Sequence, residues 1–168
     1  LHIIGDGPET HNVKKRSEEI GAFMPGRLEG PDLTAYLKKH VDVGFAMGTS
    51  ALEFGSRGIP TVLTPGDAIR RSNSPNRIYR WLHESEGFNL TSEEQEESYA
   101  LRDFDAIMRD IQNPSLVKTY GRQSYDYVMA FHDISNVAQL FIRYLARCKL
   151  TRLDLLNMDI TEFSLYEN

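Results

Sequence analysis

The sequence predicts an α/β fold: a Rossmann-like, mostly parallel sheet of about five strands with helices on both faces, followed by a helical C-terminal third. Short apolar runs bounded by glycine or proline alternate with helical patterns through residues 1–90. Within residues 41–65, two such runs flank a compact segment of helix formers, which is typical of a right-handed crossover between parallel strands. From residue 91 onward, apolar residues repeat at helical spacing.

The length and charge bound the class of protein. A chain of 168 residues indicates one domain, which we place at residues 1–150 with a C-terminal tail at 151–168. The formal net charge of −5 disfavours a nucleic-acid binder, since no basic stripe outweighs the acidic groups. No apolar run approaches the roughly 18 residues of a membrane span, and no signal peptide is visible. We therefore expect a cytoplasmic protein.

The single cysteine, Cys148, excludes an internal disulfide and a multi-thiolate metal site. It falls on the apolar face of a helical pattern, so we expect a buried structural thiol. The histidines are dispersed, with no pair at the helical spacing of metal ligands. No metal and no cofactor is expected.

The centre of the predicted sheet is a strand–helix–strand unit. Residues 41–47 and 59–63 are predicted to be adjacent inner strands that run parallel. Residues 49–57, with good helix formers at their centre, are predicted to form the short helix that connects them.

The start of this helix is the predicted ligand site. Gly48 marks the turn before it, and Thr49 or Ser50 is a suitable N-cap. Free backbone N–H groups at such a start attract phosphate. Glu53 follows one turn later, where its carboxylate can accept hydrogen bonds from a ligand's hydroxyls. A phosphate cradle and a carboxylate on one short helix suit a ribose diphosphate.

A first glycine turn is predicted near the N-terminus. Residues 1–4 form a strand that ends at Gly5 and Gly7, and residues 9–20 form an exposed helix. Thr10 stands where a dinucleotide fingerprint would need a third glycine. We therefore expect a plain strand–helix turn at the ligand edge of the sheet.

A second short strand is predicted at residues 21–25, followed by a loop and a helix that starts at Pro31. The loop carries Arg27 and Leu28. Arg27 is a candidate phosphate contact, although a lone loop arginine is more often solvated.

After the central unit, Arg70 and Arg71 lie in a loop rich in turn residues, at the edge where open α/β sheets bind ligands. They could reach a phosphate, or the loop could simply be solvated. Residues 75–85 are predicted to form a helix, with Trp81 in the core, and residues 86–90 a last short strand. Further amphipathic helices follow, one break falling at Asn113, and His132-Asp133 is more often a helix cap than a catalytic pair.

Three stretches carry a resemblance to a known family. GTSALEFGSRGIPTVL at residues 48–63, IIGDGPE at 3–9 and PGRLEGPDLTAYLKKHVDV at 25–43 occur in the order found in one domain. They resemble the C-terminal, nucleotide-sugar donor-binding domain of GT-B fold glycosyltransferases, in the group 1 or family 4 style. The resemblance covers the first ninety residues, about half of the chain.

The resemblance implies roles for particular residues. Glu53 would bind the ribose hydroxyls, and the amides of residues 48–50 would bind the diphosphate. The loop that carries Arg27 and Leu28 would touch the nucleobase, mostly through backbone. Two features depart from the family: Phe45 stands where many retaining members carry a glutamate, and the first strand of the domain, with its basic loop, has no counterpart in this sequence.

The function implied is binding of a nucleotide-diphosphate sugar for transfer to a saccharide or lipid-linked acceptor, in cell-surface polysaccharide biosynthesis. An N-terminal acceptor domain would be the partner, the full enzyme could associate peripherally with a membrane, and this chain alone would be inactive. No catalytic residue is assigned within the chain. The alternatives are a nucleotide-sugar 2-epimerase-like enzyme and a non-catalytic GT-B-derived regulatory or scaffold module.

Overall fold

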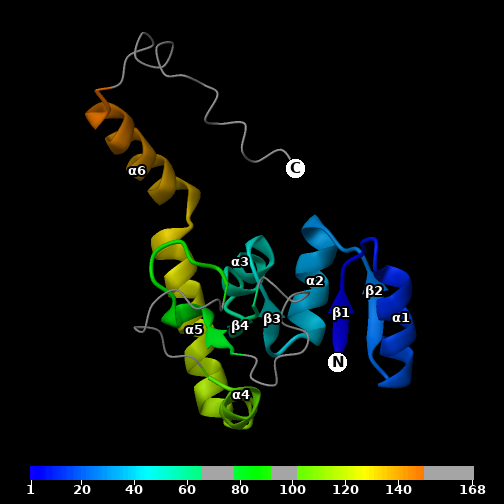
Figure 1. The fold of residues 1–168 in the computed structure, drawn as a ribbon. Coiled ribbons are helices and arrows are strands. Elements are labelled where there is room, and N and C mark those ends of the chain that lie inside the picture. The colour runs from blue at the N-terminus through cyan, green and yellow to red at the C-terminus, as the bar shows by residue number, and fades with distance from the viewer. Residues whose placement is uncertain (66–77, 92–101, 150–168) are drawn as a thin grey trace. The chain divides into compact units, whose positions relative to one another are not determined.

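A computed structural model describes residues 1–65, 78–91 and 102–149 of the chain (Figure 1). The chain divides into two compact units, residues 1–132 and residues 133–168. The described part contains both helices and parallel strands, so the predicted α/β class is confirmed. The strands form two sheets, one of two strands and one of three.

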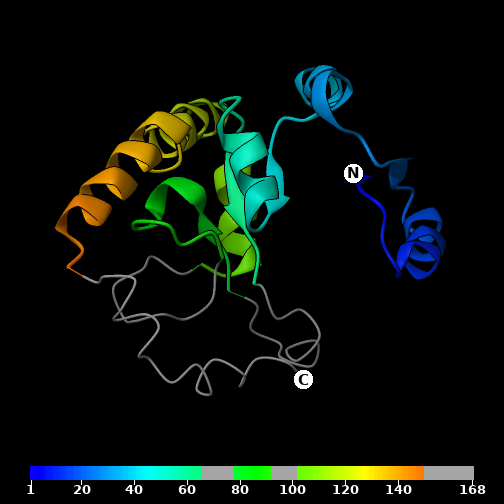
Figure 2. The ribbon, with the colours of Figure 1, turned by 90° about the horizontal axis from the view of Figure 1, so that it is seen from above.

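The first sheet pairs β1 (His2–Ile4) with β2 (Phe23–Gly26) in parallel. The connection is α1 (Thr10–Glu19), which lies beside β2 (Figures 1 and 2). Gly21, at a φ of +67°, reverses the chain between α1 and β2 in a conformation that L side chains rarely adopt. The strand–helix–strand order predicted for this segment is confirmed.

The second sheet contains the predicted central unit. In chain order, α2 (Gly30–His40) comes first. The strand–helix–strand unit follows, with β3 (Gly44–Ala46), α3 (Thr49–Gly55) and β4 (Thr61–Leu63). β3 and β4 are parallel and in register, as predicted, although both strands are shorter than the apolar runs that contain them. Gly44 is required here, because a Cβ atom at this position would lie 2.5 Å from the ring of Phe54.

The segment after β4 differs from its prediction. The expected helix at residues 75–85 is wrong where the structure describes it: β5 (Arg80–Trp81) pairs antiparallel with β4, and a 3₁₀ turn (Leu82–Glu84) follows. Tyr79 exchanges two backbone hydrogen bonds with Arg102, which extends the strand-like pairing. The expected strand at residues 86–90 is a turn instead. Short apolar runs fit both periods, and tertiary pairing decided between them.

The predicted helical character of the C-terminal third is confirmed where the structure describes it, between Phe104 and Arg147. This part comprises α4 (Phe104–Ile111), α5 (Pro114–Phe131) and α6 (Ile134–Arg147). The predicted break is the N-cap of α5, where the Asn113 side chain accepts hydrogen bonds from two backbone amides. Asp133 likewise caps α6 by accepting from Ser135 N, so the cap interpretation of His132-Asp133 is correct.

The core of the larger unit lies on both faces of β4. One cluster contains Leu63 and Leu82 together with Val128 of α5. The other contains Val62 and Trp81. Trp81 is fully buried, which confirms its prediction as a core residue. Val62 and Leu63, which are adjacent on β4, pack into different clusters because successive side chains of a strand point to opposite faces.

Cys148 is exposed, so its prediction as a buried thiol is wrong. It follows α6, in which no residue is buried, so the apolar residues that suggested burial are themselves at least partly exposed. None of the described helices is both long enough and apolar enough to cross a membrane.

Candidate functional site

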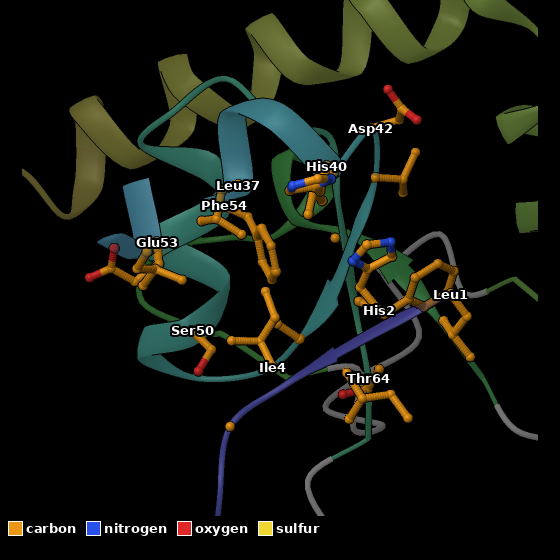
Figure 3. A pocket seen from close by; sticks show the side chains of 18 of the residues that line it. Leu1, His2, Ile4, Leu37, His40, Asp42, Ser50, Glu53, Phe54 and Thr64 are labelled. Carbon is orange, nitrogen blue, oxygen red and sulfur yellow. The ribbon is translucent and has the colours of Figure 1, made fainter. Parts of the chain in front are cut away.

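A cavity of about 1140 Å³ opens in the larger unit beside β1, β3 and the start of α3 (Figure 3). Its walls come from β1, the loop after β2, α2, β3, α3 and α4. The residues that follow the carboxyl ends of the parallel strands β1, β2 and β3 form part of its lining, and this is the position where open α/β sheets bind ligands. Most of the lining side chains are apolar.

Several of the predicted site residues meet in this cavity, although they come from three separate sequence stretches. The residues that line it are Gly5, Arg27, Leu28, Ser50 and Glu53. Gly48 and Thr49 adjoin Ser50 along the chain without lining the cavity. Gly7 does not line it either. Arg70 and Arg71 lie outside the described residues.

The start of α3 differs in one respect from its prediction. Gly48, and not Thr49 or Ser50, is the N-cap, and no side chain caps the helix. Gly48 has φ +58° and ψ −141°, a conformation that disfavours any residue with a Cβ. Its N–H donates to Leu90 O at 2.9 Å. Within the described chain, the N–H groups of Thr49 and Ser50 bond to no acceptor, so they remain available to a ligand.

Glu53 has one carboxylate oxygen engaged. Arg57 Nη1 donates to Glu53 Oε2 at 2.6 Å, and Arg57 Nη2 donates to Thr34 Oγ1 on α2 at 2.8 Å. Among the described groups, none bonds to Oε1. The side chain of Glu53 is 49% exposed. The carboxylate is thus held in place by one oxygen while the other can accept a hydrogen bond from a ligand.

The first glycine turn behaves as a plain strand–helix turn. Gly5 N donates to Gly26 O at 2.9 Å, which continues the β1–β2 pairing into the turn. Gly7 is occupied by the start of α1, because its N–H donates to Thr10 Oγ1 at 2.7 Å and its carbonyl accepts from Thr10 N at 3.0 Å. Gly5 therefore contributes to the cavity and Gly7 does not.

Arg27 lies at the cavity but already has an anionic partner. Its guanidinium donates two hydrogen bonds to the carboxylate of Glu29, and both side chains are largely exposed. The hydrogen bond to Glu29 and the negative charges of Glu29 and Asp6 raise the pKa of Arg27. A phosphate would have to compete with Glu29 for this guanidinium.

Part of the cavity wall is aromatic, with Phe45 and Phe104 among the lining residues. Phe45 of β3 is 40% exposed, and its ring lies 6.4 Å from the rings of both Tyr79 and Phe104. The position at which many of the resembled enzymes carry a glutamate is thus apolar in its surroundings as well as in its side chain. Within the described residues, no group of three or more histidine, cysteine or acidic side chains could hold a metal ion.

Two further cavity residues were not predicted. The rings of His2 and His40 stack at 5.6 Å, and Tyr36 OH lies 2.5 Å from His2 Nδ1. His2 and His40 both line the cavity. Tyr36 and His40 stand one turn apart on α2, which the sequence shows. Their contact with His2 of β1 depends on the tertiary structure, and no local sequence pattern predicts it.

Among the polar groups around this largely apolar cavity are the backbone amides of Thr49 and Ser50, the Oε1 oxygen of Glu53 and the backbone of the loop that carries Leu28. This set can bind a polar ligand with an anionic group and hydroxyls, but it contains no nucleophile–base pair. Comparison with protein-family models, with curated proteins and with solved structures found no match.

Proposed function

We propose that the unit of residues 1–132 binds a nucleotide-diphosphate sugar, as the donor-binding half of a glycosyltransferase. One observation carries the proposal. Gly5, Leu28, Ser50 and Glu53, taken from three stretches that resemble one family in order, line a single cavity beside the carboxyl ends of parallel strands.

The diphosphate would lie against the start of α3. The Thr49 and Ser50 amides have no acceptor within the described residues and can donate to phosphate oxygens. Since α3 has only seven residues, these local N–H groups matter more than a long helix dipole. The ribose would then lie near Glu53, one turn along the same helix.

Glu53 would act as the ribose anchor. A carboxylate that accepts hydroxyl hydrogen bonds gains on the order of 1.5–3 kcal/mol for each, at best. Removal of water from the charge offsets much of that gain. The bond from Arg57 to Oε2 reduces the offset, because the carboxylate is already oriented and partly desolvated before the ligand arrives.

The finer architecture belongs to the same proposal. In a donor-binding half, the strands of both sheets would belong to one mostly parallel sheet of about five strands with helices on both faces. A second domain would supply the acceptor site and the opposite wall of a closed cleft. Closure excludes water and positions the acceptor, effects that carry much of the rate. We expect residues 1–168 alone to bind nucleotide without transferring sugar.

A non-catalytic binding or scaffold module is the second candidate. The observation that favours it is that Phe45, at the position where many members of the resembled family carry a glutamate, lies against the rings of Tyr79 and Phe104. Such a module would keep the fold without needing to bind any nucleotide. A 2-epimerase-like enzyme, the third alternative, would share the ribose-binding glutamate, and an epimer-exchange assay separates it from a transferase.

Calorimetric titration with UDP, GDP and ADP tests the proposal. At least one nucleotide should bind, and Glu53→Gln should weaken its binding about tenfold or more, since the shape remains while the charge is lost. Asp42→Asn is the matched control, because Asp42 lines the same cavity away from α3. If no nucleotide binds, or if the two variants weaken binding equally, the donor-binding role is wrong.

A further inference from the structure

Two residues that do not line the cavity hold one that does. Glu53 is part of the cavity lining, whereas Arg57 and Thr34 are not. Arg57 Nη1 donates to the carboxylate oxygen Oε2 of Glu53 and to its backbone carbonyl oxygen, each at 2.6 Å. A ligand in the cavity would therefore meet the carboxylate of Glu53 and not the guanidinium of Arg57.

The same guanidinium reaches a second helix. Arg57 Nη2 donates to Thr34 Oγ1 on α2 at 2.8 Å, and Thr34 Oγ1 in turn donates to Gly30 O at 3.1 Å. Gly30 begins α2 and follows the loop whose Leu28 lines the cavity. A continuous chain of hydrogen bonds thus joins the carboxylate on α3 to the end of this loop, and the two belong to different walls of the cavity.

This arrangement restrains Glu53 more than an ordinary exposed ion pair would. In such a pair both side chains are mobile, and the contribution to stability is small. The Arg57 side chain is 26% exposed and its Nε atom is buried. Its planar guanidinium is bonded to two helices, so it cannot turn without breaking a hydrogen bond to one of them. The carboxylate that it holds is restrained likewise.

A restrained carboxylate matters for binding even where it matters little for folding. Glu53 is about half exposed, and an unrestrained glutamate side chain loses rotamer freedom when a ligand fixes it. That loss lowers affinity by roughly twofold to tenfold for each immobilised side chain. In this protein, the bond from Arg57 has fixed the side chain before a ligand arrives.

We propose that Arg57 is a positioning residue for the ribose of the bound nucleotide, acting through Glu53 and tied to α2 by Thr34. Arg57 does not touch the ligand. It holds the ribose anchor on α3 at a fixed distance from the loop that carries Leu28, so that both walls meet the nucleotide in one arrangement. The inference rests on the proposed function and adds to it the residues that set how well the site recognises ribose hydroxyls.

Three probes, compared by calorimetric titration, test this role. They are the nucleoside diphosphate that binds most tightly among UDP, GDP and ADP, its 2′,3′-dideoxy counterpart, and inorganic pyrophosphate. Only the first has the ribose hydroxyls from which Glu53 would accept hydrogen bonds. The dissociation constant of the dideoxy form divided by that of the ribose form therefore isolates the contribution of Glu53, and pyrophosphate reports any direct contact with phosphate.

This ratio should be about tenfold or more in the natural protein. Arg57→Met should lower it about fivefold, because the ligand must then fix Glu53 itself. The dideoxy form and pyrophosphate should bind this variant as they bind the natural protein, which also shows that the site has folded. Adding Arg57→Met to Glu53→Gln should change the ratio little further, because both substitutions act on one interaction.

Thr34→Val tests the link to α2. It removes the hydroxyl that accepts from Arg57 Nη2 and keeps the bond between Arg57 and Glu53, so it should lower the ratio by less, about twofold to threefold. Arg57→Lys separates the bridge from the charge. A lysine ammonium keeps the charge but lacks the planar fork that spans two helices, so it should restore only part of the ratio.

Arg122→Met is the matched control. Arg122 also faces an acidic residue four positions along its helix, Asp126, at 3.8 Å, and neither of these two residues lines the cavity. The same substitution at this position should leave the affinities for all three probes unchanged.

Three results would overturn the positioning role while nucleotide binding stands. One is an unchanged ratio in Arg57→Met, which would show that Glu53 needs no restraint. Another is an equal loss for all three probes, which would show that the guanidinium contacts phosphate or that the site has changed shape. The third is full recovery in Arg57→Lys, which would assign the effect to charge alone. If the natural protein bound none of the three nucleotides, or did not prefer the ribose form, the proposed function or its ribose anchor would be refuted, and the positioning role with it.

Discussion

Arg57 donates a hydrogen bond to the carboxylate of Glu53 at 2.6 Å, one turn further along the chain. Because Glu53 is about half exposed, the pair should add little to stability. We predict that Glu53→Gln and Arg57→Met each change the free energy of unfolding by less than about 1 kcal/mol, with a coupling near 0.3–0.5 kcal/mol in a double-mutant cycle. Urea unfolding of the four proteins measures both quantities. A larger coupling would mean that loss of nucleotide binding in Glu53→Gln could reflect altered structure.

Trp81 is predicted to depend on Asp110. Its indole Nε1 donates to Asp110 Oδ2 at 3.0 Å, and the ring is fully buried. Asp110→Ala leaves a buried donor without its acceptor, which should cost about 1–3 kcal/mol in urea unfolding. Asp110→Asn keeps an acceptor oxygen and should cost less. Equal losses in the two variants would show that the negative charge, which also faces Arg102 at 3.9 Å, matters more than the hydrogen bond.

Gly121, in the middle of α5, should not tolerate alanine. Alanine usually stabilises a helix relative to glycine by about 1 kcal/mol. Here a Cβ would clash with the carbonyl oxygen of Gly58, a backbone atom, and would also lie 3.3 Å from Pro60. We predict that Gly121→Ala lowers the free energy of unfolding by about 1–3 kcal/mol, as overpacking does. Lys118→Ala, on the exposed part of the same helix, should stay within about 0.5 kcal/mol. A gain in stability for Gly121→Ala would contradict the close approach.

The elements that the sequence predicted well are those with strong local signals. Gly48 and the apolar runs around it specify a strand, a turn and a short helix, because each residue choice agrees with the same local structure. In residues 79–82 the local signals conflict. Tyr79 and Trp81 alternate as in a strand, but they also fit one face of a helix. The antiparallel pairing with β4 decides in favour of the strand, and that pairing is not visible locally.

For the site, too, the contacts between residues close in sequence could be predicted and the long-range contacts could not. Glu53 and Arg57 stand at i and i+4, so their pairing could have been expected from helix geometry. The contact of His2 with His40, by contrast, joins residues far apart in sequence, and only the tertiary fold brings them together. The separation of β1 from β3 is of the same kind, since hydrophobic pattern predicts that strands exist but does not determine which edges meet.

His83 is predicted to make stability depend on pH. Burial, together with the positive charge of Arg102, lowers its pKa from 6.5 to about 4. Its ring lies tilted against that of Tyr120, with 4.7 Å between the ring centroids, and Glu84 and Asp110 are both paired with Arg102 nearby. The unfolded chain therefore binds a proton on this side chain at a higher pH than the folded protein does. The stabilisation is complete above pH 6.5 and is lost as pH falls toward 4.

The full shift corresponds to roughly 3 kcal/mol, and partial solvent access reduces this to on the order of 2 kcal/mol. Between pH 6.5 and about 4, we predict that the free energy of unfolding of the natural protein falls by that amount more than the free energy of unfolding of His83→Gln, because glutamine does not titrate. Unfolding in urea at several pH values measures the two curves. Burial also lowers the pKa of His132, so part of the slope should persist in the variant. Parallel curves for the natural protein and His83→Gln would refute the assignment, because His83 would then titrate alike in the folded and unfolded states.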